Sequence, residues 1–289
     1  MTVDLEALYP KLIQLLLDTV FVVDREDRIV FVSDTCENLL GYCAEELVGT
    51  PITDHMHPED RAMTRSAISQ IMQGEHQSNF RNRYVRKDGN VVHVLWSTRW
   101  SEEDRVRIGV ARDVSDLAAA EAELQFLAHH DPLTRLTNRW LFRDRLVSAL
   151  AQARRDGRVL ALLFVDIDDF KHINDVYGHT VGDHVLREVA RRLTDSVRQS
   201  DTVARLGGDE FVLLLEPVDS VETAFAKTEQ IAQVMALPLK HGSAVIRMPS
   251  CSIGLASYPA DGDDADALLA RADAAMYSAK RGRAKARAG

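Results

Sequence analysis

Residues 205–211 read Arg205-Leu206-Gly207-Gly208-Asp209-Glu210-Phe211. They lie between two strand-like runs, residues 202–204 and the apolar residues 211–215, so they predict the tip of a β-hairpin. The two glycines let the backbone turn tightly and approach a ligand where a side chain would collide. The carboxylates of Asp209 and Glu210 at such a tip face either solvent or a cation. An ordinary turn is the alternative, because glycine and aspartate are common in hairpins.

A second acidic segment follows the longest purely apolar run of the chain. This run, Val159–Val165, predicts a buried strand, and Asp166-Ile167-Asp168-Asp169 comes directly after it. In α/β sheets, ligand sites gather where such strands end. Mg²⁺ prefers oxygen ligands, usually one or two carboxylates together with substrate phosphates. Asp166 and Asp209 are therefore the natural pair for a metal site beside a nucleotide, and a solvated strand exit is the alternative.

The sequence around these segments alternates between helical and strand-like stretches. Helices are expected at residues 139–155, 182–198, 221–236 and 264–280, and strands at 159–166, 244–248 and 250–258, with the hairpin at 202–216. This alternation predicts an α/β sandwich built on a central mixed sheet.

The first part of the chain has another order of elements: two strands, then helices, then three strands. The strands are expected at residues 19–24, 29–33, 80–86, 91–100 and 105–112. This order resembles a PAS domain, an α+β fold, across roughly residues 12–116. The supporting motifs are Leu39-Leu40-Gly41-Tyr42, Glu45-Glu46-Leu47-Val48-Gly49, His57-Pro58-Glu59-Asp60-Arg61, Arg86-Lys87-Asp88-Gly89 and Asp113-Val114-Ser115. The resemblance allows a small-molecule ligand, and a module without a ligand that only mediates contacts is the alternative.

Residues 115–130 connect the two parts and are rich in alanine, glutamate and leucine. The a and d heptad positions are occupied by Leu117, Ala120, Leu124 and Leu127. This pattern predicts a helix that pairs with its counterpart in a second chain. An amphipathic helix packed within one chain is the alternative, because only about two heptads are present. We expect a sensor domain at residues 1–116, a linker helix at 117–130 and a second domain at 131–289.

From about Asp131 to Arg283 the chain resembles the GGDEF family of diguanylate cyclases. The matching motifs are Asp131-Pro132-Leu133-Thr134, Asp166-Ile167-Asp168, Phe170-Lys171, Ile173-Asn174-Asp175, Tyr177-Gly178-His179, Gly182-Asp183, Arg205 to Phe211 and Tyr277-Ser278-Ala279-Lys280. The resemblance implies an enzyme that condenses two molecules of GTP into cyclic di-GMP and pyrophosphate. It also implies a homodimer, because each active site of the family binds one GTP and two protomers must face each other.

The resemblance also implies a metal site and its ligands. Asp166 and Asp209 would hold two divalent ions, Mg²⁺ or Mn²⁺, with help from the Ile167 carbonyl and from Glu210. Asp209 or Glu210 would assist deprotonation of the attacking hydroxyl, and the two roles stay open between them.

For the nucleotide, the resemblance implies that Asn174 and Asp183 read guanine. A carboxylate can accept from the N1 hydrogen and the 2-amine of guanine, both of which adenine lacks. Helix capping is the alternative for Asp183, which is expected where a helix begins. Phosphate contacts are implied for Lys171, Lys280 and the backbone near Phe170. The family's Lys-x-x-Gly-Arg pattern is one residue shorter here, so the phosphate role of Arg283 stays open.

Arg198-Gln199-Ser200-Asp201 lies just upstream of the hairpin, at the spacing where the family carries an Arg-x-x-Asp site for product inhibition. The resemblance implies that cyclic di-GMP binds Arg198 and Asp201, since an arginine fork can pair with guanine O6 and N7. A salt bridge at a helix end is the alternative. For the whole protein, a catalytically silent receptor for cyclic di-GMP and a cyclase for another nucleotide are the rival functions.

Composition limits the partners and the location. A net charge of −9 disfavours a nucleic acid polymer as a partner, because phosphate-backbone binding needs a basic surface. No apolar run approaches the roughly 20 residues that span a bilayer, so no membrane association is expected. The N-terminus lacks a basic segment followed by a cleavage site, which favours the cytoplasm. Three cysteines without a Cys-x-x-Cys spacing argue against a disulfide framework and a structural zinc site.

Overall fold

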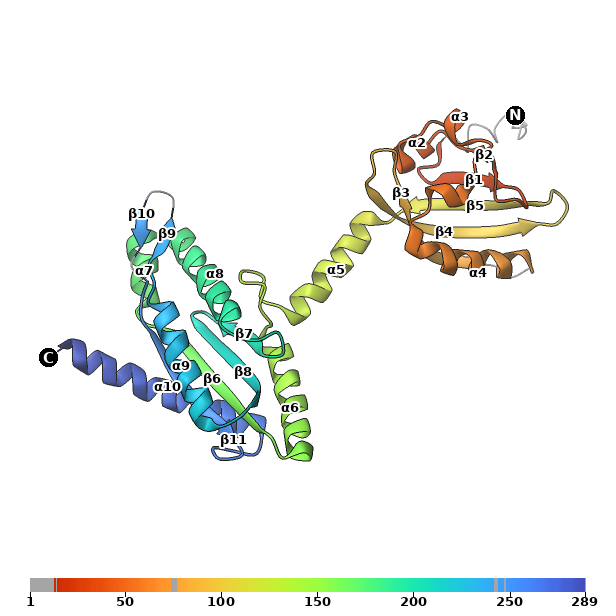
Figure 1. The fold of residues 1–289 in the computed structure, drawn as a ribbon. Coiled ribbons are helices and arrows are strands. Elements are labelled where there is room, and N and C mark those ends of the chain that lie inside the picture. Colours follow the sequence, from red (N-terminus) through yellow and green to blue (C-terminus); the bar gives the residue numbers. More distant parts are fainter. Residues whose placement is uncertain (1–12, 14, 74–76, 242–243, 247, 289) are drawn as a thin grey trace, which may run out of the picture. The chain divides into compact units, whose positions relative to one another are not determined.

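The computed structural model describes residues 13, 15–73, 77–241, 244–246 and 248–288 (Figure 1). The chain groups into two compact units, Met1–Glu123 and Leu124–Gly289. The helix α5 (Ser115–His129) crosses the boundary between them. The start of the expected sensor domain, residues 1–12 and 14, and residue 247 of an expected strand lie outside the described residues. The domain limits at 116 and 130 stay a prediction.

The N-terminal unit is a five-stranded antiparallel sheet with helices packed against it. Its strands are β1 (Thr19–Val23), β2 (Ile29–Val32), β3 (Gln77–Val85), β4 (Val91–Ser101) and β5 (Val106–Asp113), in the spatial order β2-β1-β5-β4-β3. Its helices are α2 (Cys36–Leu40), α3 (Ala44–Leu47), α4 (Arg61–Met72) and the 3₁₀ turns η1 (Ile52–His55) and η2 (Pro58–Asp60). Buried and exposed residues alternate along β4, so one face of the sheet is in the core. The expected order of two strands, helices and three strands is confirmed.

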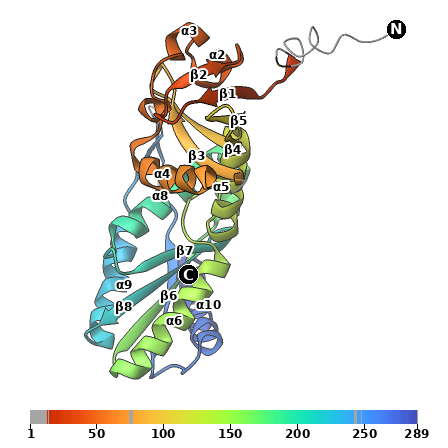
Figure 2. The same cartoon turned by 90° about the vertical axis from the view of Figure 1, so that its right-hand side faces the viewer.

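The C-terminal unit is a four-stranded sheet with helices on both faces (Figure 2). Its strands are β6 (Val159–Ile167), β7 (Thr202–Gly207), β8 (Glu210–Val218) and β11 (Cys251–Tyr258), in the order β11-β6-β8-β7. The helices are α6 (Arg139–Asp156), α7 (Phe170–Tyr177), α8 (His179–Asp195), α9 (Val221–Met235) and α10 (Ala265–Ala288). A small hairpin of β9 (Leu239–His241) and β10 (Ala244–Ile246) lies apart from the sheet.

The central strand β6 explains why two cores form. It is buried on both faces: Leu160, Leu162 and Phe164 pack with α6 and α10. Residues 161, 163, 165 and 167 pack instead with α8 and α9. Because successive side chains point to opposite faces, a continuous apolar run is what a strand between two helical layers requires.

Three details of this unit differ from expectation. The predicted fold class is confirmed. Each hydrogen-bonded pair of strands in the sheet is antiparallel, however, and parallel pairing among the described residues is limited to an isolated bridge between Thr137 and Ala204. β6 and β7 do run parallel, yet β8 lies between them. The helix expected at 182–198 begins earlier, at His179, after a separate α7. The last helix extends to Ala288 rather than ending at Lys280.

Arg192 ties α8 to the end of α9. The residue is 5% exposed, and its side chain pairs with Glu188 at 2.7 Å. It also donates to carbonyl oxygens at the end of α9 and beyond, those of Val234 (3.1 Å), Leu237 (2.6 Å) and Pro238 (3.0 Å). A cation that satisfies the last carbonyls of a helix both caps it and complements its dipole.

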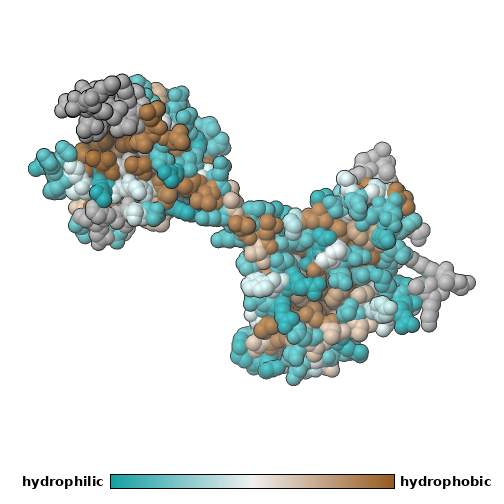
Figure 3. Space-filling view, turned by 180° about the vertical axis from the view of Figure 1, so that it is seen from behind, coloured by the Kyte–Doolittle hydropathy of each residue, from teal (hydrophilic) through white to brown (hydrophobic). Residues whose placement is uncertain are grey.

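The connecting helix α5 buries none of its side chains. Leu117, Leu124 and Leu127 are 48%, 68% and 41% exposed, and hydrophobic residues are visible on this helix in Figure 3. Within the described residues, no helix is long and apolar enough to cross a membrane.

Candidate active site

The two acidic segments come together at one end of the C-terminal sheet. The register of β6 and β8 pairs Asp166 with Glu210. The Ile167 amide donates to the Asp209 carbonyl at 3.3 Å. The strand end and the hairpin tip therefore present their carboxylates side by side, although 43 residues separate Asp166 from Asp209 in the sequence.

An arginine holds the hairpin tip in place. Both glycines have positive φ, 148° for Gly207 and 53° for Gly208. Arg205 donates to the Gly208 carbonyl through Nε (2.9 Å) and Nη2 (2.7 Å), and through Nη1 to Asp131 Oδ1 (3.0 Å). Sequence reasoning assigned no role to Arg205 or Asp131, because their contact spans 74 residues. Their presence in the matched motifs was the available signal.

The electrostatics of the carboxylates favour a cation. Burial raises the pKa of Asp166; the nearby Asp209 raises it further, although the Lys280 ammonium, 2.6 Å from Asp166 Oδ1, opposes the shift. Burial also raises the pKa of Glu210, against the pull of Arg139 at 3.9 Å. Each shift means that the ionised form is insufficiently compensated by the protein.

The donor set fits a hard divalent ion. Asp166, Asp209 and Glu210 offer carboxylate oxygens, and Mg²⁺ is usually bound by one or two of these plus substrate phosphates and water. Among the residues that the structure describes, no group of three or more His, Cys, Asp or Glu side chains forms a ready metal cage. Lys280 contacts Asp166 from α10, where an incoming ion would compete with its ammonium.

Asp168, the other buried acid of this segment, is bonded within the protein. It accepts from Ser250 Oγ at 2.6 Å and from Ser252 Oγ at 2.7 Å. Arg283 Nη1 lies 3.4 Å from Asp168 Oδ2 and also donates to the Cys251 carbonyl. Asp168 thus fastens the end of β6 to β11 and to α10. Arg283 therefore contacts protein groups in this structure, and its role at a phosphate stays open.

The residues expected to read guanine lie on α7 and α8. A Cβ on Gly182 would meet Asn174 Oδ1 at 1.9 Å, so only glycine lets the Asn174 side chain lie in its present place against α8. The same Cβ would approach the Phe170 ring at 3.3 Å. Capping by Asp183 was a wrong alternative, because α8 begins at His179 and its N-cap is Gly178. Lys171, on the first turn of α7, is exposed.

Arg198 and Asp201 line a separate cavity of about 280 Å³ between the α8–β7 loop and α9. Asp201 accepts from the Arg198 amide at 2.9 Å and from the Glu216 amide at 3.1 Å. In the described part of the chain no ion pair joins the two side chains, which disfavours the helix-end salt bridge. The Arg198 side chain is exposed.

Comparison with known proteins places these residues in a family context. The family model described as "Diguanylate cyclase, GGDEF domain" matches residues 128–286, and a PAS fold model matches residues 29–110. The chain is 49% identical over 166 residues to the bifunctional diguanylate cyclase/cyclic di-GMP phosphodiesterase MucR of Pseudomonas aeruginosa, covering 57% of this chain. It is 30% identical over 276 residues to the probable diguanylate cyclase DgcE of Escherichia coli, covering 92% of this chain. The chain spans 24% of the length of each of these relatives.

Solved structures agree for the C-terminal unit. The GGDEF domain of TpbB from Pseudomonas aeruginosa is 46% identical with a TM-score of 0.52, and the match covers 53% of this chain and 90% of that one. The coiled coil and GGDEF domain of DgcB from Caulobacter crescentus, in complex with c-di-GMP, is 32% identical with a TM-score of 0.52. That match covers 58% of this chain and 89% of the other.

Proposed function

Since this chain belongs to the GGDEF family of diguanylate cyclases, we propose that it condenses two molecules of GTP into cyclic di-GMP and pyrophosphate. The observation that carries the proposal is the pairing of Asp166 with Glu210 beside Asp209, at the end of a buried strand. GTP as substrate is consistent with a cytoplasmic location.

The acidic residues would hold two divalent ions, Mg²⁺ or Mn²⁺, through Asp166, Asp209, Glu210 and the Ile167 carbonyl. When bound, such ions neutralise the triphosphate and stabilise the departing pyrophosphate. Lys280, released from Asp166, would contact a phosphate oxygen, together with Lys171 and the backbone at Phe170. Glu210 or Asp209 would accept the proton of the attacking 3′-hydroxyl.

Incubation of the chain with GTP and Mg²⁺, followed by mass spectrometry of the products, tests this function. Cyclic di-GMP and pyrophosphate are expected, with no cyclic product from ATP. Binding of added cyclic di-GMP without any turnover by a dimeric sample would favour the silent receptor instead. Turnover of ATP or a mononucleotide product would favour a cyclase of another kind.

Metal binding should depend on pH because protons compete for the same oxygens. With their pKa values raised in the folded chain, Asp166 and Glu210 keep protons at a pH where ordinary carboxyls are ionised. These two carboxyl groups therefore stabilise the metal-free fold, relative to the unfolded chain, at low pH. Their contribution to stability is lost as the pH rises through the raised pKa values. We expect the increase in Tm on adding Mg²⁺ to be small near pH 4.5 and to grow towards pH 7. An increase that does not change over this range would contradict a carboxylate site.

Guanine recognition would rest on Asn174 and Asp183, and Gly182 keeps Asn174 in position. Gly182→Ala is expected to displace the Asn174 amide and to raise the KM for GTP roughly tenfold or more, because a buried hydrogen bond to the base is lost. Thr180→Ala, at an exposed position two residues away, is the matched control. Steady-state kinetics measure both variants. An unchanged KM in Gly182→Ala, with folding intact, would remove Asn174 from the base site.

Product inhibition would use the cavity at Arg198 and Asp201. Arg198→Ala is expected to remove inhibition by added cyclic di-GMP while leaving the initial rate near normal, since the cavity is lined by residues outside the catalytic cluster. Arg187→Ala, an exposed arginine on α8, serves as control. Progress curves with and without added cyclic di-GMP give the result. Inhibition that persists in Arg198→Ala would assign the product to another site.

Two protomers are needed if each active site holds one GTP, and α5 is the natural contact between them. Its exposed leucines lie at a and d positions of the heptad pattern. The N-terminal unit, which matches a PAS fold, would then regulate the encounter of two cyclase units through this helix.

A further inference from the structure

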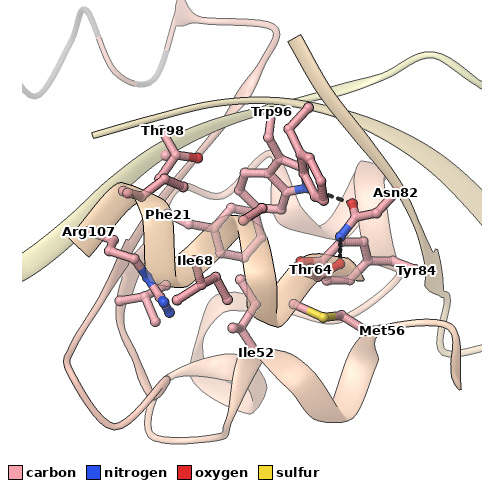
Figure 4. Close-up of a pocket in the computed structure, with 15 residues that line it drawn as sticks. Phe21, Ile52, Met56, Thr64, Ile68, Asn82, Tyr84, Trp96, Thr98 and Arg107 are labelled. Atoms are coloured by element: carbon pink, nitrogen blue, oxygen red, sulfur yellow. Dashed lines mark hydrogen bonds between the residues drawn. The ribbon is translucent and has the colours of Figure 1, made fainter. Parts of the chain in front are cut away.

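The N-terminal unit contains a cavity of about 50 Å³ between its sheet and α4. Figure 4 shows side chains from several elements converging on it. Its apolar walls include Phe21, Met56, Ile68, Tyr84 and Trp96. A cavity with such walls excludes charged or strongly hydrated ligands unless polar groups at its edge can receive them.

On one side of the cavity, the polar groups are already bonded to one another. The Trp96 indole Nε1 donates to Asn82 Oδ1 at 2.9 Å, and Asn82 Nδ2 donates to Thr64 Oγ1 at 3.1 Å. Thr64 Oγ1 in turn donates to the Asp60 carbonyl at 2.8 Å. This chain of hydrogen bonds is closed by the protein, so a ligand gains little from contacting it.

On the other side lies Arg107, seen opposite Asn82 in Figure 4. The residue is 4% exposed, and its Nη2 pairs with Asp27 in the turn between β1 and β2. Its Nη1 is buried without a hydrogen-bond partner in the described structure. A buried guanidinium donor without an acceptor is costly, and such groups normally have a partner.

We propose that this cavity binds a small molecule with a compact apolar body and one oxygen-bearing head group, a carboxylate or a carbonyl, that accepts a hydrogen bond from Arg107 Nη1. The apolar body would contact the walls at Phe21 and Ile68, which line the same cavity. The cavity is about a third of the roughly 150 Å³ that admits benzene, so the ligand has about two to four carbon atoms. Short monocarboxylates and short ketones share this chemistry.

The proposal deepens the sensory role proposed for this unit, and binding can be measured without the cyclase reaction. Isothermal titration of the full chain with propionate and with butanone is the first measurement. We expect saturable binding of at least one of them and a matching rise in Tm. Binding of propionate but not of butanone would identify an ionised head group. Binding of butanone but not of propionate would identify a neutral carbonyl. No binding of either would overturn the proposal and leave a water molecule as the partner of Arg107.

Three variants locate the bound molecule. Arg107→Met is expected to weaken binding about tenfold or more, because the charged donor is lost. Arg99→Met, at an exposed position on β4, should bind as the unmodified chain does. Ala67→Leu fills the cavity from α4, leaves Arg107 intact and should abolish binding.

Circular dichroism melts of the N-terminal unit report whether each variant is folded, because all three positions lie in that unit. Turnover of GTP without added ligand reports separately whether the cyclase proposal holds. If GTP is not turned over while propionate or butanone binds, the cyclase proposal fails and the cavity proposal stands. Equal affinity of Arg107→Met and the unmodified chain would overturn the cavity proposal, whatever the cyclase activity.

Discussion

Asp209→Asn is expected to lower the rate of cyclic di-GMP formation roughly a thousandfold, while the chain keeps its Tm. Asp209 lies at the hairpin tip, where its charge adds to that of Asp166 and raises the pKa of that residue. Removing this charge would take away an ionised oxygen ligand that we propose holds cations at the triphosphate. Its removal also relieves repulsion within the cluster, so the metal-free fold should not be weakened.

Asp144→Asn is the matched control, since Asp144 is exposed on α6 and outside the acidic cluster. Its rate should equal that of the unmodified chain. Mg²⁺ titrations of both variants separate the causes, because loss of an ion ligand should abolish the Mg²⁺-dependent rise in Tm only in Asp209→Asn. A normal rate in Asp209→Asn would mean that the acidic cluster is not the site of the reaction.

Gly254→Ala should destabilise the C-terminal unit by about 2–3 kcal/mol, a fall in Tm of roughly 5–10 °C. Gly254 lies on β11 opposite Phe164, and α10 crosses directly over it. A Cβ there would meet the Ala272 carbonyl at 2.1 Å and the Met276 amide at 2.2 Å. Both obstacles are backbone, so the whole helix has to move away.

The displacement should also lower activity, because Lys280 is one turn further along α10 and reaches Asp166. Gly282→Ala is the matched control, because it makes the same substitution on α10, the helix that packs over Gly254. No atom lies within 4 Å of the Cβ that it would add, so it should be neutral or stabilising by up to about 1 kcal/mol. Circular dichroism melts that follow the transition of the C-terminal unit measure both. Equal Tm values for the two variants would show that α10 can shift without cost.

Patterns with a short period were readable from the sequence alone. The apolar run at Val159–Val165 predicted β6, and the glycine pair at 207–208 predicted the hairpin that follows it in the sheet. Both signals are local, because burial on two faces and a tight turn each constrain the residue types within the segment.

Features that depend on distant partners were not readable. Asp168 looked like another member of an acidic cluster, yet it bonds serines 82 and 84 residues away. The sequence predicts a helix that begins at Gly182, whereas α8 begins at His179. In the structure this glycine lies inside the helix, where the Asn174 side chain requires its lack of a Cβ. Tertiary packing here overrides local propensity.

The Arg192 clamp has a mechanical consequence. Because one guanidinium bonds α8 to four carbonyls at and beyond the end of α9, sliding these helices past each other would strip a buried cation of its acceptors. We therefore expect α8 and α9 to move together as one rigid unit. Asn174 packs against Gly182 near one end of this unit, and the cavity at Arg198 lies beside the other end. A molecule bound in that cavity would therefore contact the same pair of helices against which Asn174, the residue that we propose reads guanine, is packed.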